Sequence, residues 1–275
     1  MNITLQNLEA KALNSKEFDK LLSFLKDFLS SQKPDLAIIL GSGISFDLPL
    51  SSAQSISYQD LPGMPQTSVK GHKGKLVFGK TASGKKILIF SGRYHLYEGL
   101  GCEEVQLPVK IIHSLGCKNI LLTNSAGGIQ SELKVADLMI IEAIKDYQND
   151  GKLNNPRGLL DCLEKSSLKL DTKLTQEILI DSSLKTGAYA AVLGPNYETL
   201  SEISLFKYQD CSAVGMSTYL EAKFALEKSL NVAAVSVITN IWNDDSKPTH
   251  KEVLENSSKA KVKMNRLFER IVSLI

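Results

Sequence analysis

Apolar residues recur along residues 14–31 at the spacing of one helix face, and the pattern then changes abruptly. The spacing predicts an amphipathic helix, and Asn14 with Glu17 fits a capping box at its start. Pro34 ends the helical pattern. The continuous apolar run LAIIL at residues 36–40 then predicts a buried strand, which leads directly into a glycine-rich turn.

Short apolar runs of this kind return along the chain and alternate with helical patterns. Strands are expected at residues 75–79, 86–91, 119–123, 137–142, 189–193, 212–214 and 232–239. Helices are expected at residues 106–115, 174–184, 198–208, 220–229 and 250–275. The polar stretch 145–173 reads as a long loop with broken helix. This order predicts an α/β fold: a single domain over residues 1–275, with a mixed, largely parallel twisted sheet flanked by helices on both faces.

Polar and glycine-rich segments follow several of the expected strands. In sheets of this type, the carboxyl ends of the strands hold the loops that bind ligands. The segments are GSG from Gly41, GRYH from Gly92, NSAGG from Asn124, GPNYET from Gly194 and NIWND from Asn240. Their recurrence predicts a ligand site along one edge of the sheet.

Composition and charge narrow the class of partner. The chain has 275 residues, 43% of them hydrophobic, which is enough to bury a sizeable core. The net charge of +2, without a stripe of lysine and arginine, argues against nucleic acid or an anionic membrane as main partner. The N-terminal segment lacks the pattern of a signal peptide, and no apolar run is long enough to span a membrane. The scattered cysteines predict reduced thiols in a cytoplasmic protein.

Two familiar motifs are incomplete. Residues 79–85 have the spacing of a phosphate-binding P-loop, but Lys86 stands where Ser or Thr would hold magnesium, and the segment joins two expected strands. The Gly-Ser-Gly turn begins like a dinucleotide fingerprint, but Phe46 occupies the position of the third glycine. The histidines do not have the spacing of metal ligands. We therefore expect no metal and no organic cofactor.

The segment 91–99 suggests an anion site beside a sugar. If it stays extended, Arg93, His95 and Tyr97 project from one face, because side chains alternate along a strand. A guanidinium next to an imidazole and a phenol suits an anion that adjoins a sugar. Ser42 in the glycine-rich turn can donate its hydroxyl and backbone N–H to the same anion. A solvated strand end is the competing interpretation, and the segment alone does not decide.

Two further segments suit an aromatic base. The small residues of NSAGG, among them Ser125 and Ala126, let a ligand approach the backbone closely, although a tight turn explains them equally well. Tyr197 can stack on a base, and the carboxylate of Glu198 can accept a hydrogen bond from its N–H. For an isolated Tyr-Glu pair, helix capping is the competing interpretation.

Taken together, these segments resemble the trimeric purine nucleoside phosphorylase family, within the nucleoside phosphorylase and methylthioadenosine phosphorylase superfamily. The matching blocks are GSG (41–43), GHKGKLVFG (71–79), SGRYHLYEG (91–99), TNSAGG (123–128), GPNYET (194–199), AVGMSTYLEA (213–222), ITN (238–240) and THKEVL (249–254). Eight blocks in the right order make the match specific. The resemblance implies a homotrimer that uses phosphate as co-substrate to cleave 6-oxopurine ribonucleosides or deoxyribonucleosides, such as inosine and guanosine, without a metal.

The resemblance also implies a role for each matched position. The phosphate site would comprise Ser42, Arg93, His95, the backbone N–H of Ser125, and Ser217, with His72 on a nearby loop. Tyr97, Met216 and His250 would face the ribose. Ala126, Tyr197, Glu198 and Asn240 would contact the purine. His95, Glu198 and Asn240 would act in catalysis, although phosphate itself is the nucleophile that attacks C1′.

The chain departs from the family pattern at several positions. Family members usually have a longer segment before GPxxET, with an aromatic residue that reaches into the neighbouring subunit's site. Here residues 155–158 match that segment only faintly, and no aromatic residue lies between positions 151 and 188. Ser125 and Tyr197 replace the more usual Ala and Phe. Trp242 is a candidate substitute for the lost apolar cover.

Two other functions are open at this point. A 5′-methylthioadenosine phosphorylase is expected to have an acid in place of Asn240 and a small apolar pocket in place of His250, so both residues argue against it. A non-catalytic purine-binding protein on the same fold is disfavoured by the intact Arg93, His95 and Glu198. Phosphate-dependent release of base from inosine distinguishes these alternatives.

Overall fold

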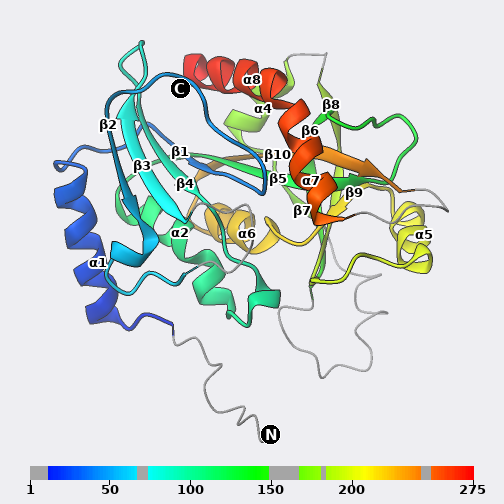
Figure 1. Ribbon diagram of the computed structural model, residues 1–275, viewed down its shortest axis with the longest axis horizontal. Helices are drawn as coiled ribbons and strands as arrows, with labels where there is room; N and C mark the ends of the chain where they lie inside the picture. The colour runs from blue at the N-terminus through cyan, green and yellow to red at the C-terminus, as the bar shows by residue number, and fades with distance from the viewer. Residues whose placement is uncertain (1–11, 67–73, 149–166, 181–183, 243–248) are drawn as a thin grey trace, which may run out of the picture.

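Helices and strands alternate through the residues that the computed structural model describes, 12–66, 74–148, 167–180, 184–242 and 249–275 (Figure 1). The strands are β1 Leu36–Ile39, β2 Ser51–Ser57, β3 Lys75–Lys80, β4 Lys86–Ser91, β5 Asn119–Gly128, β6 Leu138–Tyr147, β7 Leu168–Lys169, β8 Lys185–Val192, β9 Cys211–Gly215 and β10 Asn231–Ile241. The helices are α1 Ser15–Phe28, α2 Cys102–Ser114, α4 Lys173–Leu179, α5 Leu200–Tyr208, α6 Tyr219–Glu227, α7 His250–Lys259 and α8 Lys261–Leu274, with 3₁₀ turns η2 Tyr58–Asp60 and η3 Leu96–Glu98. Each strand expected from the sequence is present, and so is each expected helix, although the one expected over 250–275 is divided. The stretch 145–173, expected as a loop with broken helix, contains the end of β6 and the short strand β7 within its described residues.

The strands join into one sheet with the order β10-β6-β8-β9-β5-β1-β4-β3-β2, and β7 pairs with β6. β10 also pairs with β5, so β5, β10, β6, β8 and β9 form a closed ring. The pairs β1–β4, β1–β5, β5–β10, β6–β8 and β8–β9 are parallel. The pairs β2–β3, β3–β4, β5–β9, β6–β7 and β6–β10 are antiparallel. The sheet is mixed as expected, but its antiparallel pairing is more extensive than expected, and its ring closure was not anticipated.

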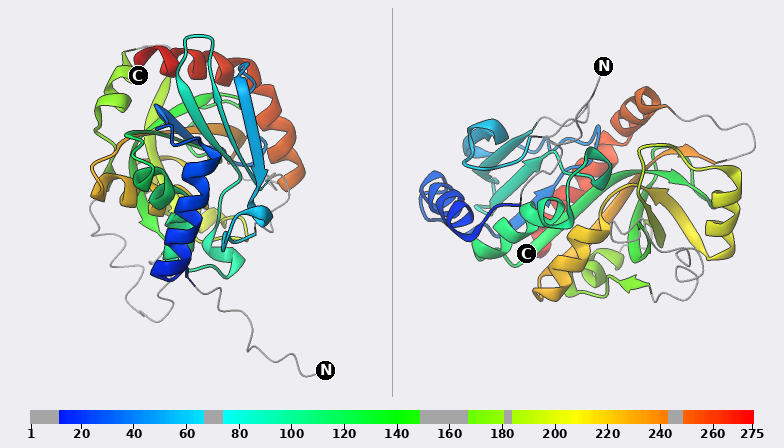
Figure 2. Two further views of the ribbon diagram at one scale, coloured as in Figure 1. Left: turned by 90° about the vertical axis from the view of Figure 1, so that its left-hand side faces the viewer. Right: turned by 90° about the horizontal axis from the view of Figure 1, so that it is seen from below.

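Helices cover both faces of the sheet, as Figure 2 shows from two directions. Ala37 and Ile39 of β1 belong to a core cluster that also contains side chains of α1, α2 and α6. Leu36 and Ile38 belong to a second cluster, formed with α4 and α8. Because alternate residues of a strand point to opposite faces, each face of β1 packs against its own set of helices. The expected α/β class is confirmed.

The N-terminal helix α1 has the predicted capping box and apolar face. The backbone N–H of Glu17 donates to Asn14 Oδ1 at 3.1 Å, and the N–H of Asn14 donates to Glu17 Oε2 at 2.9 Å. Phe18, Leu21 and Leu25 are the buried residues of this helix. They place α1 in the first core cluster, so the helix packs onto the same face of the sheet as α2 and α6.

The C-terminal tail, expected as one helix over 250–275, is two helices divided at Ala260. This residue is both the C-cap of α7 and the N-cap of α8, and it is fully buried. α8 packs on the sheet through buried residues that include Phe268 and Ile271, whereas Ser257 is the only buried residue of α7. The expectation of a continuous helix was therefore wrong, because the two halves pack against different surroundings.

Helix α5 begins two residues later than expected. Thr199 caps it by accepting from the N–H of Glu202 at 3.3 Å, and Glu202 Oε2 accepts in return from the N–H of Thr199 at 2.7 Å. Tyr197 and Glu198 consequently precede the helix and are not its caps. The capping interpretation of this Tyr-Glu pair is wrong.

The segment 79–85 comprises the end of β3 and the turn of a β3–β4 hairpin, in which the N–H of Thr81 donates to the carbonyl of Lys85 at 2.9 Å. It is therefore not a P-loop, as the sequence indicated. Strand β2 was missed because most of its residues are polar and exposed.

Within the described residues, no helix is both long enough and apolar enough to cross a membrane. Cys117 and Cys211 are free thiols, and burial raises the pKa of Cys117 to about 12. These two cysteines agree with the expectation of reduced thiols, while Cys162 lies outside the described residues.

Candidate functional site

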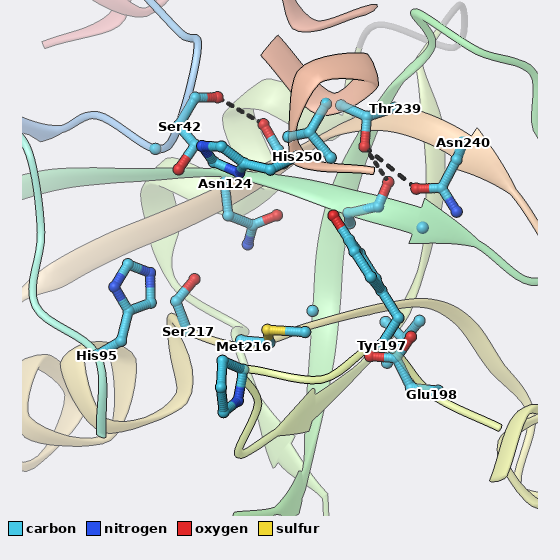
Figure 3. A pocket seen from close by; sticks show the side chains of 18 of the residues that line it. Ser42, His95, Asn124, Tyr197, Glu198, Met216, Ser217, Thr239, Asn240 and His250 are labelled. Carbon is cyan, nitrogen blue, oxygen red and sulfur yellow. Dashed lines mark hydrogen bonds between the residues drawn. The ribbon is translucent and has the colours of Figure 1, made fainter. Parts of the chain in front are cut away.

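A cavity of about 420 Å³ lies where β1, β5, β9 and β10 end (Figure 3). Its lining includes every residue predicted for the site except His72, which lies outside the described residues. The predicted residues that line it are Ser42, Arg93, His95, Tyr97, Ser125, Ala126, Tyr197, Glu198, Met216, Ser217, Asn240 and His250. Residues given no ligand role beforehand complete the lining: Gly41, Asn124, Gly127, Pro195, Val214, Gly215, Thr239, Trp242 and Val253.

The turn after β1 packs closely against the end of β5 and is hydrogen-bonded to it. A Cβ atom on Gly41 would lie 2.7 Å from the Cα of Asn124, so only glycine allows this approach. The carbonyl of Ser42 accepts from Ser125 Oγ at 2.7 Å and from Ser257 Oγ at 3.2 Å. The two hydroxyl oxygens lie 2.8 Å apart. Hydrogen bonds therefore tie this turn both to β5 and to α7.

Arg93 forms a buried ion pair with Glu221 of α6. Arg93 Nε donates to Glu221 Oε1 at 3.3 Å and Nη2 donates to Oε2 at 2.8 Å, while Nη1 donates to the carbonyl of Thr123 at 2.5 Å. Both side chains are 1% exposed. The fork geometry fixes the plane of the guanidinium, and the carboxylate compensates its charge. The sequence analysis identified Arg93 but not Glu221.

His95 is oriented by Glu98 from within the same segment. Glu98 Oε1 lies 3.0 Å from His95 Nδ1 and also accepts from the His95 backbone N–H at 2.9 Å. The imidazole stacks on the ring of Tyr97 with centroids 4.7 Å apart and planes at 19°. Residues 96–98 form the turn η3, so the condition that the segment 91–99 stays extended is not met. Arg93, His95 and Tyr97 nevertheless line the same cavity.

The loop after β9 is held by buried hydroxyl groups. The N–H of Ser217 donates to the hydroxyl of Tyr189 at 3.4 Å, and burial raises the pKa of Tyr189 to about 12. Thr218 has a φ of +77° and accepts from Asn124 Nδ2 at 2.8 Å. Within the described residues, Asn124 Oδ1 is buried without a hydrogen-bond partner. This leaves an acceptor at the cavity wall beside Ser217.

The side chains predicted to face a ribose come from three separate segments. Met216 and Tyr97 meet at Gly194, where a Cβ atom would lie 2.5 Å from Met216 Sδ and 2.9 Å from Tyr97 Cδ1. The φ of Gly194 is +75°, a conformation that favours glycine. His250 is the first residue of α7, and Figure 3 shows it on the same side of the pocket as Ser42. The structure thus brings these three residues to one cavity.

A bulge in β10 orients Asn240. The register of β10 against β5 shifts between Ile238 and Asn240. The hydroxyl of Thr239 donates to the carbonyl of Ala126 and to Asn240 Oδ1, each at 3.3 Å. Asn240 Nδ2 is buried without a partner among the residues that the structure describes. Because Oδ1 is engaged as an acceptor, the unpaired group of this side chain is its N–H donor.

Tyr197 and Glu198 lie with Asn240 at one end of the pocket, whereas His95 and Ser217 lie at the other (Figure 3). Burial raises the pKa of the Glu198 carboxyl to about 7, and the nearby charge of Glu202 adds to this effect. Both protonation states are therefore accessible near neutral pH.

The groups that hold the lining in place were mostly not found from the sequence. Glu221, Glu98 and Tyr189 position lining residues, and Thr239 and Asn124 belong to the lining itself. Glu221 lies among apolar residues of a helix, and Thr239 and Asn124 lie within buried strands. A polar residue at an otherwise apolar position is the sequence pattern that marks such groups.

Comparisons with known proteins show the family to which this chain belongs. Residues 35–273 match the family model described as Phosphorylase superfamily. Purine nucleoside phosphorylase 1 of Geobacillus stearothermophilus is 32% identical over 271 residues, which cover 94% of this chain and 98% of that protein. The chain therefore belongs to the phosphorylase superfamily and, within it, to the purine nucleoside phosphorylase family.

Solved structures of this family share the fold. The Schistosoma mansoni purine nucleoside phosphorylase in complex with inosine matches with a TM-score of 0.80 and 29% identity, covering 97% of this chain and 99% of that one. The same protein in complex with adenosine also has a TM-score of 0.80, with 30% identity, covering 96% of this chain and 98% of that one.

The raised pKa of Glu198 predicts how folding stability depends on pH. The carboxyl binds its proton more tightly in the folded chain than in the unfolded chain. Its contribution to stability is therefore complete below about pH 4.5 and is lost as the pH rises through about 7. Glu198→Gln mimics the neutral form, so it should gain stability relative to the parent between pH 5 and pH 8, by on the order of 1 kcal/mol for a partly solvated group.

Denaturant unfolding of the ligand-free protein at pH 5 and pH 8 measures this difference. The exposed Glu227 of α6 provides the control, because Glu227→Gln should not show the same change with pH. An equal stability difference for Glu198→Gln at both pH values contradicts the prediction.

Proposed function

We propose that this protein is a purine nucleoside phosphorylase that converts 6-oxopurine ribonucleosides and deoxyribonucleosides, with inorganic phosphate, to the free base and the sugar 1-phosphate. The main support is the buried, unpaired Nδ2 of Asn240 in a cavity whose opposite end holds His95 and Ser217. A buried donor without a partner is costly unless a ligand acceptor satisfies it. A purine offers such acceptors, and the other end of the cavity suits an anion.

The phosphate end combines fixed donors with little net charge. The guanidinium of Arg93 is held by Glu221, so it contributes directed N–H groups rather than an uncompensated cation. Glu98 engages His95 through Nδ1, so a contact between the imidazole and phosphate runs through Nε2. The hydroxyls of Ser42 and Ser217 and the N–H of Ser125 complete the proposed set, and the resemblance adds His72.

The reaction requires phosphate beneath the sugar and the purine at the far end of the cavity. A phosphate oxygen forms a bond to C1′ while the bond from C1′ to N9 breaks, and the electron pair of that bond leaves with the purine. Positive charge develops on the ribose, where the neighbouring phosphate stabilises it. Because the cavity holds both substrates together, attack is effectively unimolecular. The proposed ribose contacts are Tyr97, Met216 and His250, and the unpaired Oδ1 of Asn124 is available to a sugar hydroxyl.

Negative charge on the departing purine is stabilised by Asn240, which can donate from Nδ2 to N7. Glu198, when ionised, accepts from N1–H. Because the pKa of Glu198 is raised to about 7, binding of an N1–H donor selects the ionised carboxylate. Tyr197 and Ala126 supply the remaining proposed contacts with the base. No side chain is needed as a nucleophile.

The first prediction is that base release requires phosphate. The hydrogen-bond donors at the phosphate end suit an anion and would not bind a water molecule that acts as the nucleophile. The protein should therefore release hypoxanthine from inosine only when phosphate is present, and it should form ribose 1-phosphate. Arg93→Ala should weaken phosphate use by roughly 2–4 kcal/mol, the cost of losing a buried charged contact. Comparable base release in phosphate-free buffer would indicate a hydrolase.

A second variant separates phosphate binding from folding. Arg93→Ala leaves Glu221 buried without its partner, which destabilises the protein. The double variant with Glu221→Ala removes that orphan carboxylate. Phosphate use should stay impaired in both variants, while thermal stability should recover in the double variant.

The second prediction concerns base choice and rests on Glu198 and Asn240. Adenine has an acceptor at N1, which would face the carboxylate of Glu198, and an amino donor at C6, which would face the amide donor of Asn240. Each of these two unmade hydrogen bonds costs about 1–3 kcal/mol of binding free energy. Inosine should therefore exceed adenosine in kcat/KM by at least about a hundredfold. Asn240→Asp supplies an acceptor for the amino group and should narrow this gap. Because a related structure holds adenosine, the prediction concerns turnover and not occupancy.

Equal kcat/KM for the two nucleosides in the unmodified protein would show that these two residues do not select the base. The matched variant Asn240→Ala loses the donor without gaining an acceptor. It should lower inosine turnover without raising that of adenosine.

We further propose a homotrimer that acts in purine salvage in the cytoplasm. The trimer rests on the resemblance to trimeric family members, and the free thiols of Cys117 and Cys211 support a reducing compartment. Sedimentation at micromolar concentration should give about three times the chain mass of 30.1 kDa. A fully active species of 30.1 kDa would refute the trimer.

A further inference from the structure

We infer that Trp242 is a further base-binding residue, whose indole N–H donates, together with the amide of Asn240, to the O6 and N7 acceptors of a 6-oxopurine. The inference rests on the proposed function and adds a second donor to that function's base site. It concerns a residue whose only expected role was apolar cover.

Trp242 is held rigidly at the base end of the cavity. It is the single tryptophan of the chain, it follows the last residue of β10, and it is 6% exposed. Its backbone N–H donates to the carbonyl of Gly128 at 2.9 Å, which continues the pairing of β10 with β5. The ring packs in an apolar cluster that includes Val214 of β9 and Phe206 of α5. Its position is therefore set by two strands and a helix.

The indole N–H and the amide of Asn240 converge on Gly127. A Cβ atom built on Gly127 would lie 2.6 Å from Trp242 Nε1 and 3.1 Å from Asn240 Nδ2. All three residues line the cavity. The absence of a side chain at Gly127 is thus what lets the two donors approach the same point of the backbone. Asn240, one of the two donors, lies at the end of the pocket that also holds Tyr197 and Glu198 (Figure 3).

Neither donor is paired within the protein. Asn240 Nδ2 is fully buried without a hydrogen-bond partner among the residues that the structure describes. No described residue accepts a hydrogen bond from Trp242 Nε1, whose residue is 6% exposed and lines the cavity. A buried polar group is normally hydrogen-bonded, and a donor in a cavity wall can bond to a ligand in that cavity. Two unpaired donors side by side therefore indicate a ligand that presents two adjacent acceptors.

The O6 and N7 atoms of hypoxanthine and guanine are two such acceptors. Adenine replaces O6 with an amino group, so one of the two donors would face another donor. An amide can turn to present its oxygen, but an indole N–H is a donor only. Trp242 consequently selects against the 6-amino group in a way that a rotation of Asn240 cannot relieve.

The first test is substitution. Trp242→Phe keeps an aromatic ring in the apolar cluster but removes the N–H. We expect kcat/KM for inosine to fall about tenfold and that for adenosine to change less than twofold, so their ratio falls about tenfold. Phe206→Leu, which alters packing beside Trp242 and keeps the N–H, should leave the ratio unchanged. A ratio unchanged in Trp242→Phe, or a ratio that falls equally in Phe206→Leu, overturns the inference.

The second test uses the unmodified protein, so it does not depend on how the variant folds. Because the chain contains one tryptophan, the ¹⁵N-labelled protein gives a single indole N–H resonance. Saturating hypoxanthine should shift this resonance downfield, as expected when the N–H gains an acceptor, and adenine should shift it less. An indole resonance that hypoxanthine does not shift, or that both bases shift equally, overturns the inference.

The two proposals can fail separately. Absence of phosphate-dependent inosine cleavage by the unmodified protein refutes the proposed reaction. If inosine is cleaved and hypoxanthine binds, but neither the nucleoside ratio nor the indole resonance responds, the reaction stands and the role of Trp242 is refuted.

Discussion

The end of β5 is hydrogen-bonded on both edges, and the cavity depends on this pairing. Gly127 pairs with Asn240 of β10 on one side and with Val214 of β9 on the other. These contacts close the ring of strands, and they bring the ends of β5, β9 and β10 together as parts of one wall. A side chain at Gly127 would collide with Asn240 and Trp242, so the same glycine that permits closure also permits the arrangement of polar groups around it.

The buried charged groups of the site hold its proposed anion-binding side chains in fixed orientations. The ion pair of Arg93 with Glu221 lies almost wholly out of water, where desolvation offsets much of the attraction between the two charges. What the pair provides is a guanidinium with a defined plane, fixed further by the carbonyl of Thr123. The imidazole of His95 is oriented in the same way by the carboxylate of Glu98. The side chains of Arg93 and His95 are thus oriented before any ligand arrives, which reduces the entropy lost on binding.

Local sequence patterns predicted most elements, and together with the family resemblance they named twelve of the twenty-one lining residues. Apolar strands followed by polar segments revealed the edge of the sheet that holds the site, and the capping box marked the start of α1. The closure of the strands into a ring was not predictable, because no residue near β10 in the sequence specifies that this strand pairs with both β5 and β6. The same limit applies to Glu221, whose role depends on Arg93 at a separation of 128 positions.

Ala260 divides the C-terminal segment into two helices that are held in place by different contacts. α8 is anchored by side chains such as Phe268 and Ile271 in the core beneath it, whereas α7 begins with His250 at the cavity and buries only Ser257. α7 is nevertheless tied to the strand ends, because Asn256 Nδ2 donates to the carbonyl of Thr239 at 2.7 Å and Ser257 Oγ donates to that of Ser42 at 3.2 Å. Adaptation of the cavity mouth to a different sugar can therefore proceed at the exposed positions of α7, whereas Asn256, Ser257 and the inner face of α8 tolerate little change.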